Sequence, residues 1–449
     1  MLRCLQILCV ALLPLAPPLV AATYDIVSET AIDTVPAGFP VGFSLLTHNG
    51  KHYAAYYNAD HVMTLAECAV GGSEWRKKYL PTKIGWDSHN YVTMAMDKAG
   101  HLHVAGNMHN VPLVYFRARK PHDNQSLTRS VMVGRNESRC TYPVFFTDAD
   151  GELLFLYRDG GSGQGSSIVN RYDVATQTWT RFLDEPLFDG EGERNSYPLG
   201  PIKGPDGLFH LVWVWRDTPD CATNHHLSYA RSRDLKHWET AAGEPLELPL
   251  RLGQRETWVD PIPSGGGIIN GCQQLTFDDD LRPIISYHKS DDAGNMQVYL
   301  ARFEQDAWQP HPVTTWDKPV HFEGFGSMPF IGIKISSLRP LGAKHWILDY
   351  RHRDYGRGSI VVDKEFLQPT TDHPQIESQY PQELLDSDSD WPGIEVRLAQ
   401  DETVVPNTDK KYVLRWETLG TNHDRPRELP LPPASRLQLI ELERASSSP

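Results

Sequence analysis

The sequence has few cysteines and no long apolar run beyond its first residues. It contains six cysteines in 449 residues, and Cys4 and Cys9 both fall in the N-terminal apolar stretch. This low density excludes a small fold built around disulfides. The other four cysteines allow three pairings, and their spacing does not choose among them. After residue 22, no stretch approaches the roughly 20 apolar residues of a membrane-spanning helix, so we expect no membrane segment in the mature chain.

Positive charge is also scarce. The chain has 43 Lys and Arg residues against 57 Asp and Glu residues, with a formal net charge of -14 and a sequence pI near 5.7. This balance argues against a general nucleic-acid-binding protein. An acidic protein can still bind an acidic sugar through a local arginine pocket.

Helical periodicity is hard to find, whereas short strand-forming runs recur between Gly, Asp, Asn and Pro turns. The repeated unit is a strand, a turn with glycine or acidic residues, and a second strand. Its turn glycines Gly100, Gly151 and Gly207 lie 51 and 56 residues apart, a period that suits a four-stranded blade with its loops. We therefore predict an all-β fold, a seven-bladed β-propeller. Its blades are expected near residues 40–84, 86–135, 140–186, 196–250, 266–315, 326–372 and 390–443, with a strand near 24–37 closing the ring.

The N-terminus has the pattern of a secretory signal. Arg3 supplies positive charge, an apolar run follows, and Val20, Ala21 and Ala22 offer small residues for cleavage. We expect residues 1–22 to be a signal peptide, 23–443 a single propeller domain and 444–449 a disordered tail. The mature protein is expected to be secreted or periplasmic, and monomeric.

Polar and basic side chains recur at the strand ends of the second, third and fourth predicted blades. His89 precedes one strand and His109 follows its hairpin partner, so antiparallel pairing places both at the same end of a small sheet. Tyr142 opens the third blade, while Arg158 and Arg216 end the second strands of the third and fourth blades. Equivalent positions in adjacent blades converge on one rim of the axial channel, so we expect these side chains to meet there.

These residue types suit one reaction on a uronic acid. An arginine fork can neutralise the sugar carboxylate bidentately, which makes the proton at C5 easier to remove. A base then takes that proton while an acid protonates the oxygen leaving C4, and histidine or tyrosine can serve either role if its pKa is tuned. The set predicts β-elimination that leaves an unsaturated uronate. Taken singly, each residue also has a structural interpretation as a packed histidine, a rim aromatic or a locally paired arginine.

The stretch Gly85–Tyr91, followed by Gly106–Asn110 and Pro112–Arg117, resembles BNR-repeat propellers that include ulvan lyases and L-rhamnose-α-1,4-D-glucuronate lyases. The resemblance covers most of residues 40–365. It implies a seven-bladed propeller in which elimination occurs on the anterior rim.

The resemblance also implies a role for each residue of the set. His109 and Tyr142 become the acid and base candidates, with the assignment between them left open. His89 helps to position them, and Arg158 and Arg216 hold the carboxylate. Asn90 and Asn107 are expected to contact the substrate, an acidic plant or algal polysaccharide with rhamnose–glucuronate linkages such as those of arabinogalactan or gum arabic. No cofactor is required for this chemistry, and a structural calcium or zinc is implied by resemblance alone, without assigned ligands.

Two other functions stay open. The segment Phe39–Gly50 resembles the first blade of related propellers described as α-L-rhamnosidases, in which a single histidine on the posterior face acts on the same linkage, and His48 matches that histidine. Hydrolysis usually uses two carboxyl groups, and no comparable pair is evident in the sequence. The third function is non-catalytic glycan binding.

Overall fold

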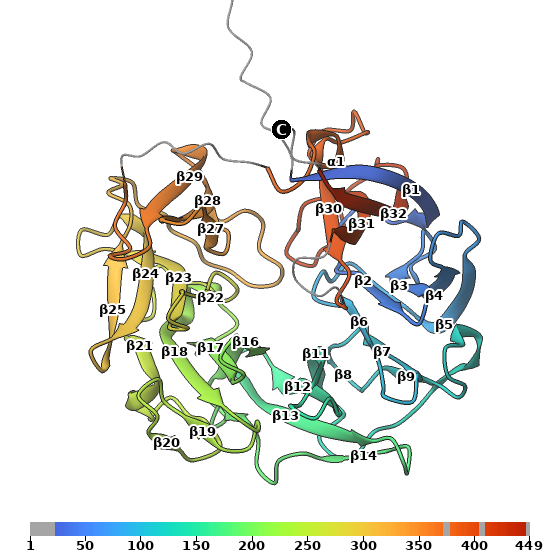
Figure 1. The fold of residues 1–449 in the computed structure, drawn as a ribbon, viewed down its shortest axis with the longest axis horizontal. Helices are drawn as coiled ribbons and strands as arrows, with labels where there is room; N and C mark the ends of the chain where they lie inside the picture. The colour runs from blue at the N-terminus through green and yellow to red at the C-terminus, as the bar shows by residue number, and fades with distance from the viewer. Residues whose placement is uncertain (1–22, 371–377, 404–408, 446–449) are drawn as a thin grey trace, which may run out of the picture.

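The computed structural model describes residues 23–370, 378–403 and 409–445. The expected signal peptide lies outside these residues. Within them the chain forms seven sheets, arranged as blades around a central axis (Figure 1), which confirms the predicted fold. No helix among the described residues has the length and apolar character to cross a membrane.

The first three blades carry most of the predicted site. Blade one contains β2 (Ser44–His48), β3 (Lys51–Tyr57), β4 (Val62–Ala69) and β5 (Arg76–Lys83). Blade two contains β6 (Val92–Met96), β7 (Leu102–Gly106), β9 (Tyr115–Ala118) and β10 (Leu127–Arg129), the last preceded by the short helix η1 (Asn124–Ser126). Blade three contains β11 (Cys140–Thr147), β12 (Leu153–Gly161), β13 (Gln164–Asp173) and β14 (Thr178–Arg181), joined by β8 (His109–Val111) and β15 (Phe188–Asp189).

The next three blades continue the ring. Blade four contains β16 (Asn195–Lys203), β17 (Phe209–Arg216), β18 (Asn224–Ser232), β19 (Trp238–Glu239), β20 (Pro245–Leu246) and β21 (Trp258–Asp260), with η2 (Cys221–Thr223) and η3 (Arg255–Thr257) between them. Blade five contains β22 (Gln274–Phe277), β23 (Pro283–Ser290), β24 (Met296–Glu304) and β25 (Ala307–Pro312). Blade six contains β26 (Ile333–Ile335), β27 (Arg339–Leu341), β28 (His345–His352) and β29 (Gly356–Asp363).

Blade seven combines both ends of the described chain. After α1 (Gln382–Leu385), β30 (Ile394–Gln400), β31 (Lys410–Leu419) and β32 (Ser435–Arg444) form three strands, and β1 (Tyr24–Val35) pairs antiparallel with β32 to complete the blade. The strand expected near 24–37 therefore does close the ring. Of the tail expected at 444–449, Arg444 instead ends β32 and pairs with Tyr24, and the N–H of Ala445 donates to the carbonyl of Thr23; residues 446–449 lie outside the described residues.

Burial explains why these runs form strands. The second strand of each early blade lies between neighbouring strands and neighbouring blades, so β7 and β17 are buried along their whole length. These strands show no regular alternation of polar and apolar residues, and they are mostly apolar apart from His103, His210 and Arg216. The four cysteines of the described residues, Cys68, Cys140, Cys221 and Cys272, are buried and free, so packing rather than disulfides holds the blades together.

Candidate functional site

The start of each blade's inner strand and the end of its second strand lie on the same rim of the ring. His89 lies in the loop before β6, and His109 begins β8 after β7. β8 leaves blade two and pairs with β11 of blade three, where His109 lies opposite Thr141. This crossing brings the two histidine rings to a centroid distance of 4.4 Å. The structure thus places His89 and His109 on the same rim, as hairpin geometry predicted.

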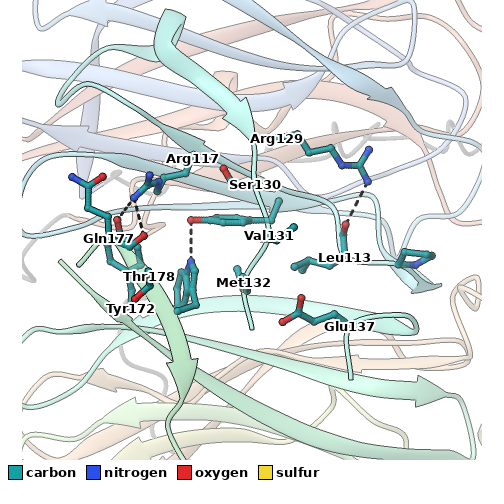
Figure 2. A pocket seen from close by; sticks show the side chains of 13 residues that line it. Leu113, Arg117, Arg129, Ser130, Val131, Met132, Glu137, Tyr172, Gln177 and Thr178 are labelled. Carbon is teal, nitrogen blue, oxygen red and sulfur yellow. Dashed lines mark hydrogen bonds between the residues drawn. The ribbon is translucent and has the colours of Figure 1, made fainter. Parts of the chain in front are cut away.

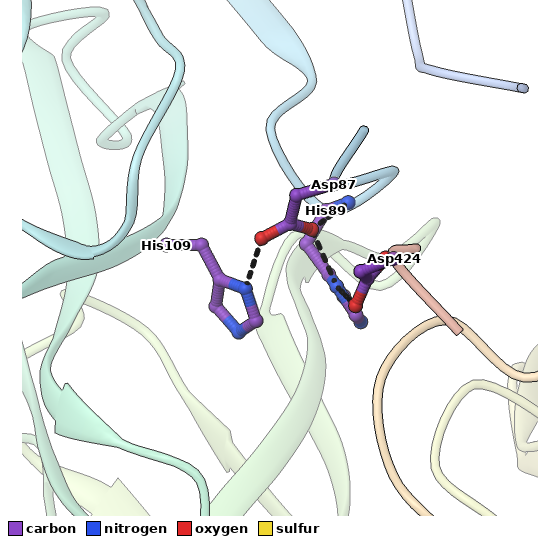
Figure 3. Close-up of side chains that lie close together, drawn as sticks. All are labelled: Asp87, His89, His109 and Asp424. Atoms are coloured by element: carbon purple, nitrogen blue, oxygen red, sulfur yellow. Dashed lines mark hydrogen bonds and ion pairs between the residues drawn. The ribbon is translucent and has the colours of Figure 1, made fainter. Parts of the chain in front are cut away.

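Asp87 organises the loop that carries His89. Its Oδ1 accepts hydrogen bonds from the backbone N–H and from Nδ1 of His89, both at 2.9 Å, and its Oδ2 accepts from Nδ1 of His109 at 2.5 Å. Figure 3 shows the carboxylate between the two rings. Burial alone would raise the pKa of Asp87, but the hydrogen bonds and charges of the histidines hold it below its ordinary value. Because a carboxylate only accepts, Nδ1 of His109 carries the hydrogen and a neutral His109 has its free lone pair on Nε2.

Asp424 approaches the same loop from a distant part of the chain. Its Oδ2 lies 3.1 Å from Nδ1 of His89, and its Oδ1 accepts from the backbone N–H of Ser88. Burial would lower the pKa of His89, but the hydrogen bonds and charges of Asp424 and Asp87 raise it to about 9. His89 is therefore a cation at neutral pH.

Tyr142 reaches the rim through a local distortion of β11. The pairing of β11 with β12 shifts between Thr141 and Val144, and Tyr142 has a φ of 55°. Pro143 lacks the N–H that a regular ladder needs, which favours such a bulge. A left-handed aromatic residue costs about 1–3 kcal/mol, and this kind of strain clusters at functional sites. The Tyr142 ring lies 5.9 Å from that of His89 and 6.2 Å from that of His109.

Arg158 is a buried cation without a carboxylate partner among the described residues. It is 4% exposed, and its Nε donates to the carbonyl of Gly160 at 3.1 Å. Both Nη1 and Nη2 are buried and have no hydrogen-bond partner. Asp159 does not pair with it, since that carboxylate accepts from Asn136. Two orphaned guanidinium nitrogens form the fork that a bound carboxylate would satisfy.

Arg216 is more fully engaged by the protein. Its Nε donates to the carbonyl of Thr218 at 3.0 Å, and its Nη2 donates to the carbonyl of Pro219. Nη1 lies 3.5 Å from the hydroxyl of Tyr197 and 3.4 Å from Oδ1 of Asn270. Arg216 therefore lies on the predicted rim, but its guanidinium nitrogens already contact protein groups, including the hydroxyl of Tyr197.

Tyr197 is a site residue that the sequence prediction missed. The guanidinium carbons of Arg158 and Arg216 lie 5.6 and 5.5 Å from its ring centre, and the Tyr142 ring lies 6.0 Å away. Burial would raise the pKa of Tyr197, but the two arginine charges lower it below its ordinary value. For Tyr142, burial prevails and the pKa is raised. The signal was present in the sequence, because Tyr197-Pro198 opens blade four as Tyr142-Pro143 opens blade three.

The two asparagines predicted to contact the substrate, Asn90 and Asn107, differ in whether their side chains are already hydrogen-bonded. Oδ1 of Asn90 is buried and has no hydrogen-bond partner, which leaves it available to a ligand. Asn107 uses its amide for packing, because Nδ2 donates to Thr82 Oγ1 at 2.6 Å and to the Lys83 carbonyl at 2.9 Å. Both line a cavity of about 420 Å³ together with Asp87 and His109.

Two further cavities open beside the same residues. His89, Tyr142 and Arg216 line one of about 500 Å³. Tyr142, Arg158 and Tyr197 line one of about 270 Å³. The imidazole, phenol and guanidinium groups thus face open space, which a reaction on a bound sugar requires.

His48 lies at the opposite end of its blade from this rim. It ends β2 at the turn into β3, whereas β2 begins on the side of the site. Its ring stacks on that of His122 at 5.2 Å, and its Nδ1 has no hydrogen-bond partner. Burial and the nearby charge of His122 lower the pKa of His48. The anterior and posterior candidates therefore occupy separate faces.

One group of described residues has the donors for a metal ion. The ligand atoms of Asp87, His89, His109 and Asp424 lie within 4.8 Å of one another. Two imidazoles and two carboxylates suit tetrahedral zinc, whereas calcium prefers six to eight oxygens. The same atoms already pair with one another through imidazole N–H groups, so zinc would have to displace those hydrogens. A structural calcium or zinc stays a prediction.

A further groove of about 690 Å³ lies between blades two and three (Figure 2), and no histidine lines it. Arg117 Nη1 donates to the Tyr172 hydroxyl at 2.5 Å, and Trp179 Nε1 donates to the Tyr115 hydroxyl at 3.1 Å. These polar groups are hydrogen-bonded to one another and leave none of these donors for a ligand. We therefore attribute this groove to the packing of blades two and three.

The fold and the rim together define a β-propeller with a polar site on one face that contains a buried guanidinium with unpartnered nitrogens. Residues 51–316 match the BNR repeat-containing family, and the chain belongs to that family. It is 27% identical over 183 residues to the short isoform of ulvan lyase from Alteromonas sp. (strain LOR), covering 37% of this chain and 35% of that protein. It is 51% identical over 124 residues to the long isoform from Pseudoalteromonas sp. (strain PLSV), covering 26% of this chain and 12% of that protein. The chain thus spans about a third or less of these curated relatives.

Solved structures share the architecture over a much larger extent. The polysaccharide lyase Uly1 superimposes with a TM-score of 0.60 at 14% identity, covering 94% of this chain and all of that one. An ulvan lyase of family PL25 superimposes with a TM-score of 0.56 at 12% identity, covering 87% of this chain and 93% of that one. A further structure of the latter enzyme is described as bound to -[GlcA(1-4)Rha3S]-. At these identities the likeness concerns the fold.

Proposed function

We propose that this protein is a polysaccharide lyase that cleaves an acidic polysaccharide at a rhamnose–glucuronate linkage by β-elimination. The observation that carries the proposal is Arg158, whose Nη1 and Nη2 are buried without partners beside Tyr142 and the site cavity. A buried guanidinium needs an anion to offset its desolvation. The uronate carboxylate is that anion, and the relatives that act on ulvan support the substrate class.

Charge neutralisation comes first in the proposed reaction. Arg158 binds the sugar carboxylate bidentately, and the His89 cation, held by Asp87 and Asp424, adds positive charge nearby. Both lower the energy of the carbanion-like state that forms when C5 loses its proton. The ring cation of His89 makes it a poor base, so its role is electrostatic.

Proton transfer falls to His109 and Tyr142. Asp87 fixes the His109 tautomer with Nδ1–H toward the carboxylate, so Nε2 accepts the C5 proton, as in other carboxylate-oriented histidine bases. Tyr142, whose pKa is raised, keeps its proton at neutral pH and donates it to the departing O4. The C5–H and C4–O4 bonds break, a C4=C5 double bond forms, and no oxidant or reductant is needed.

The product distinguishes elimination from hydrolysis. Incubation with ulvan, and separately with gum arabic, should yield a new ultraviolet absorbance from the conjugated uronate, with a mass that shows no added water. Release of rhamnose from gum arabic without new absorbance would reject elimination and favour the hydrolase. Heat of binding without any product would indicate a glycan-binding propeller. Activity on ulvan alone would exclude gum arabic as the substrate.

The hydrolase keeps one specific observation in its favour. His48 is half-buried on the posterior face, with an unpartnered Nδ1 and a lowered pKa, so a neutral imidazole is available there. The anterior site nevertheless supplies base, acid and carboxylate-binding groups together. A polymeric substrate also accords with the exported location that we propose from the N-terminal sequence.

A further inference from the structure

The cavity that contains His89 and Tyr142 extends to a wall that the proposed chemistry does not use. Blades six and seven form this wall. Lys334 on β26, Arg351 on β28, and Glu395 and Arg397 on β30 line the cavity of about 500 Å³. Lys334 lies opposite Arg351 in the strand pairing, so these two cations are neighbours on one sheet.

The wall carries an excess of positive charge. Arg397 Nη2 lies 3.0 Å from Glu395, and Arg351 Nη1 lies 3.7 Å from the same carboxylate. Glu395 is the single carboxylate among the described residues that line this cavity. Lys334 has no carboxylate partner in the part of the chain that the structure describes, and the Nε of Arg397 is buried without a hydrogen-bond partner. The wall thus carries three cations and one carboxylate, which pairs with only two of them, in a chain whose net charge is -14.

An aromatic ring stands beside these cations. Phe330 is 40% exposed, and the guanidinium carbon of Arg351 lies 4.2 Å from its ring centre. The cation orients the ring and leaves part of it open to the cavity. An exposed ring beside charged groups suits a sugar, whose apolar C–H face packs on the aromatic surface while its anionic substituent meets the cations.

We propose that Lys334, Arg351 and Phe330 form a second, anion-binding subsite for the saccharide adjacent to the reacting uronate. The anion is a carboxylate or a sulfate ester on that neighbouring residue. The subsite rests on the proposed function, because it shares its cavity with His89 and Tyr142. It makes the enzyme selective for chains that carry regularly spaced negative charge.

The test compares Lys334→Ala and Arg351→Ala with Lys344→Ala, an exposed lysine in the turn before β28 at the other end of blade six. Substrates are ulvan and chemically desulfated ulvan. Each subsite variant should raise KM on ulvan about five- to tenfold with kcat nearly unchanged, since the lost contact is made before and during the reaction alike. Raised salt should shrink the difference. Lys344→Ala should match the unaltered protein.

Each outcome has one meaning. A KM effect that disappears on desulfated ulvan identifies a sulfate subsite, and an effect that persists identifies a carboxylate subsite. Unchanged KM for both variants on both substrates overturns the proposal. If the unaltered protein releases no unsaturated product, affinity electrophoresis in gels containing ulvan still decides. Weaker retardation of Lys334→Ala than of Lys344→Ala then supports the subsite while the lyase assignment fails, and equal retardation rejects the subsite.

Discussion

The guanidinium carbon of Arg158 lies 4.9 Å from the ring centre of Tyr142. This cation lowers the pKa of the phenol, but burial raises it by more, so the net pKa lies above its ordinary value. At Tyr197 burial also raises the pKa, but the charges of Arg158 and Arg216, together with hydrogen bonds to Asn195 and Ser162, outweigh it and the pKa falls. The two tyrosines that open adjacent blades therefore have pKa values shifted in opposite directions.

His109→Ala and Tyr142→Phe should each reduce kcat for elimination by about 10²–10⁴-fold, the usual contribution of one acid or base. Both side chains are partly exposed to the site cavities, so the thermal midpoint of unfolding should change little. Ultraviolet detection of the unsaturated product and a thermal melt measure the two effects. Full turnover in either variant would remove that residue from the mechanism.

Arg158→Met should abolish activity while leaving stability equal or higher. The native guanidinium is buried with two unpartnered nitrogens, and replacing such a charge by an apolar chain of similar length relieves its desolvation. Arg181→Met is the matched control, because its guanidinium bonds the Tyr157 hydroxyl and the Asn170 side chain and its loss should lower the melting temperature. A large loss of stability in Arg158→Met would show that this arginine serves the fold.

Asp424→Asn should move the alkaline limit of activity to lower pH. The Asp424 charge helps to hold the pKa of His89 at about 9, and the amide keeps an oxygen acceptor while removing that charge. Because the folded pKa is raised, protonated His89 stabilises the fold fully below pH 6.5, and this stability is lost as pH rises through about 9. The melting temperature of the native protein should therefore fall more across that window than that of Asp424→Asn. Identical pH profiles would contradict this role.

Tyr197→Phe should remove a phenol that ionises below its ordinary pKa. A spectrophotometric titration that follows tyrosinate absorbance would show one fewer early-titrating group in the variant. Since Tyr197 contacts both arginines, activity should also fall, whereas Tyr299→Phe, on blade five, should leave the early-titrating phenol in place. An unchanged titration curve would show that the two cations do not act on Tyr197 as inferred.

His48→Ala tests the posterior face. For an anterior lyase, release of unsaturated product should stay within about twofold of the unaltered rate, because His48 lies at the far end of its blade. Loss of rhamnose release with an intact melt would instead assign the reaction to that face. The same assay with His109→Ala provides the reciprocal comparison.

Strand periodicity and turn spacing sufficed to predict the propeller, its blade number and the closing strand, because each blade repeats one local pattern. The shared position of His89 and His109 followed from hairpin geometry. Asp424 could not be found this way, since a loop of blade seven brings it to the rim from the far end of the chain. Tyr197 could have been found by comparing the Tyr-Pro pairs that open blades three and four. The opposite pKa shifts of Tyr142 and Tyr197 depend on burial, charges and hydrogen bonds from other parts of the chain, which local patterns do not encode.

The pairing of β1 with β32 has a consequence for biosynthesis. While the ribosome is still adding the last blade, the earliest strand has no partner and its edge is available to other chains. Ring closure therefore waits until β32 has been synthesised and can pair with β1. A frameshift or stop codon before β32 would leave the seventh blade incomplete, with β1 unpaired and an open seam. Such a product should be cleared by proteases rather than accumulate as a partly active enzyme.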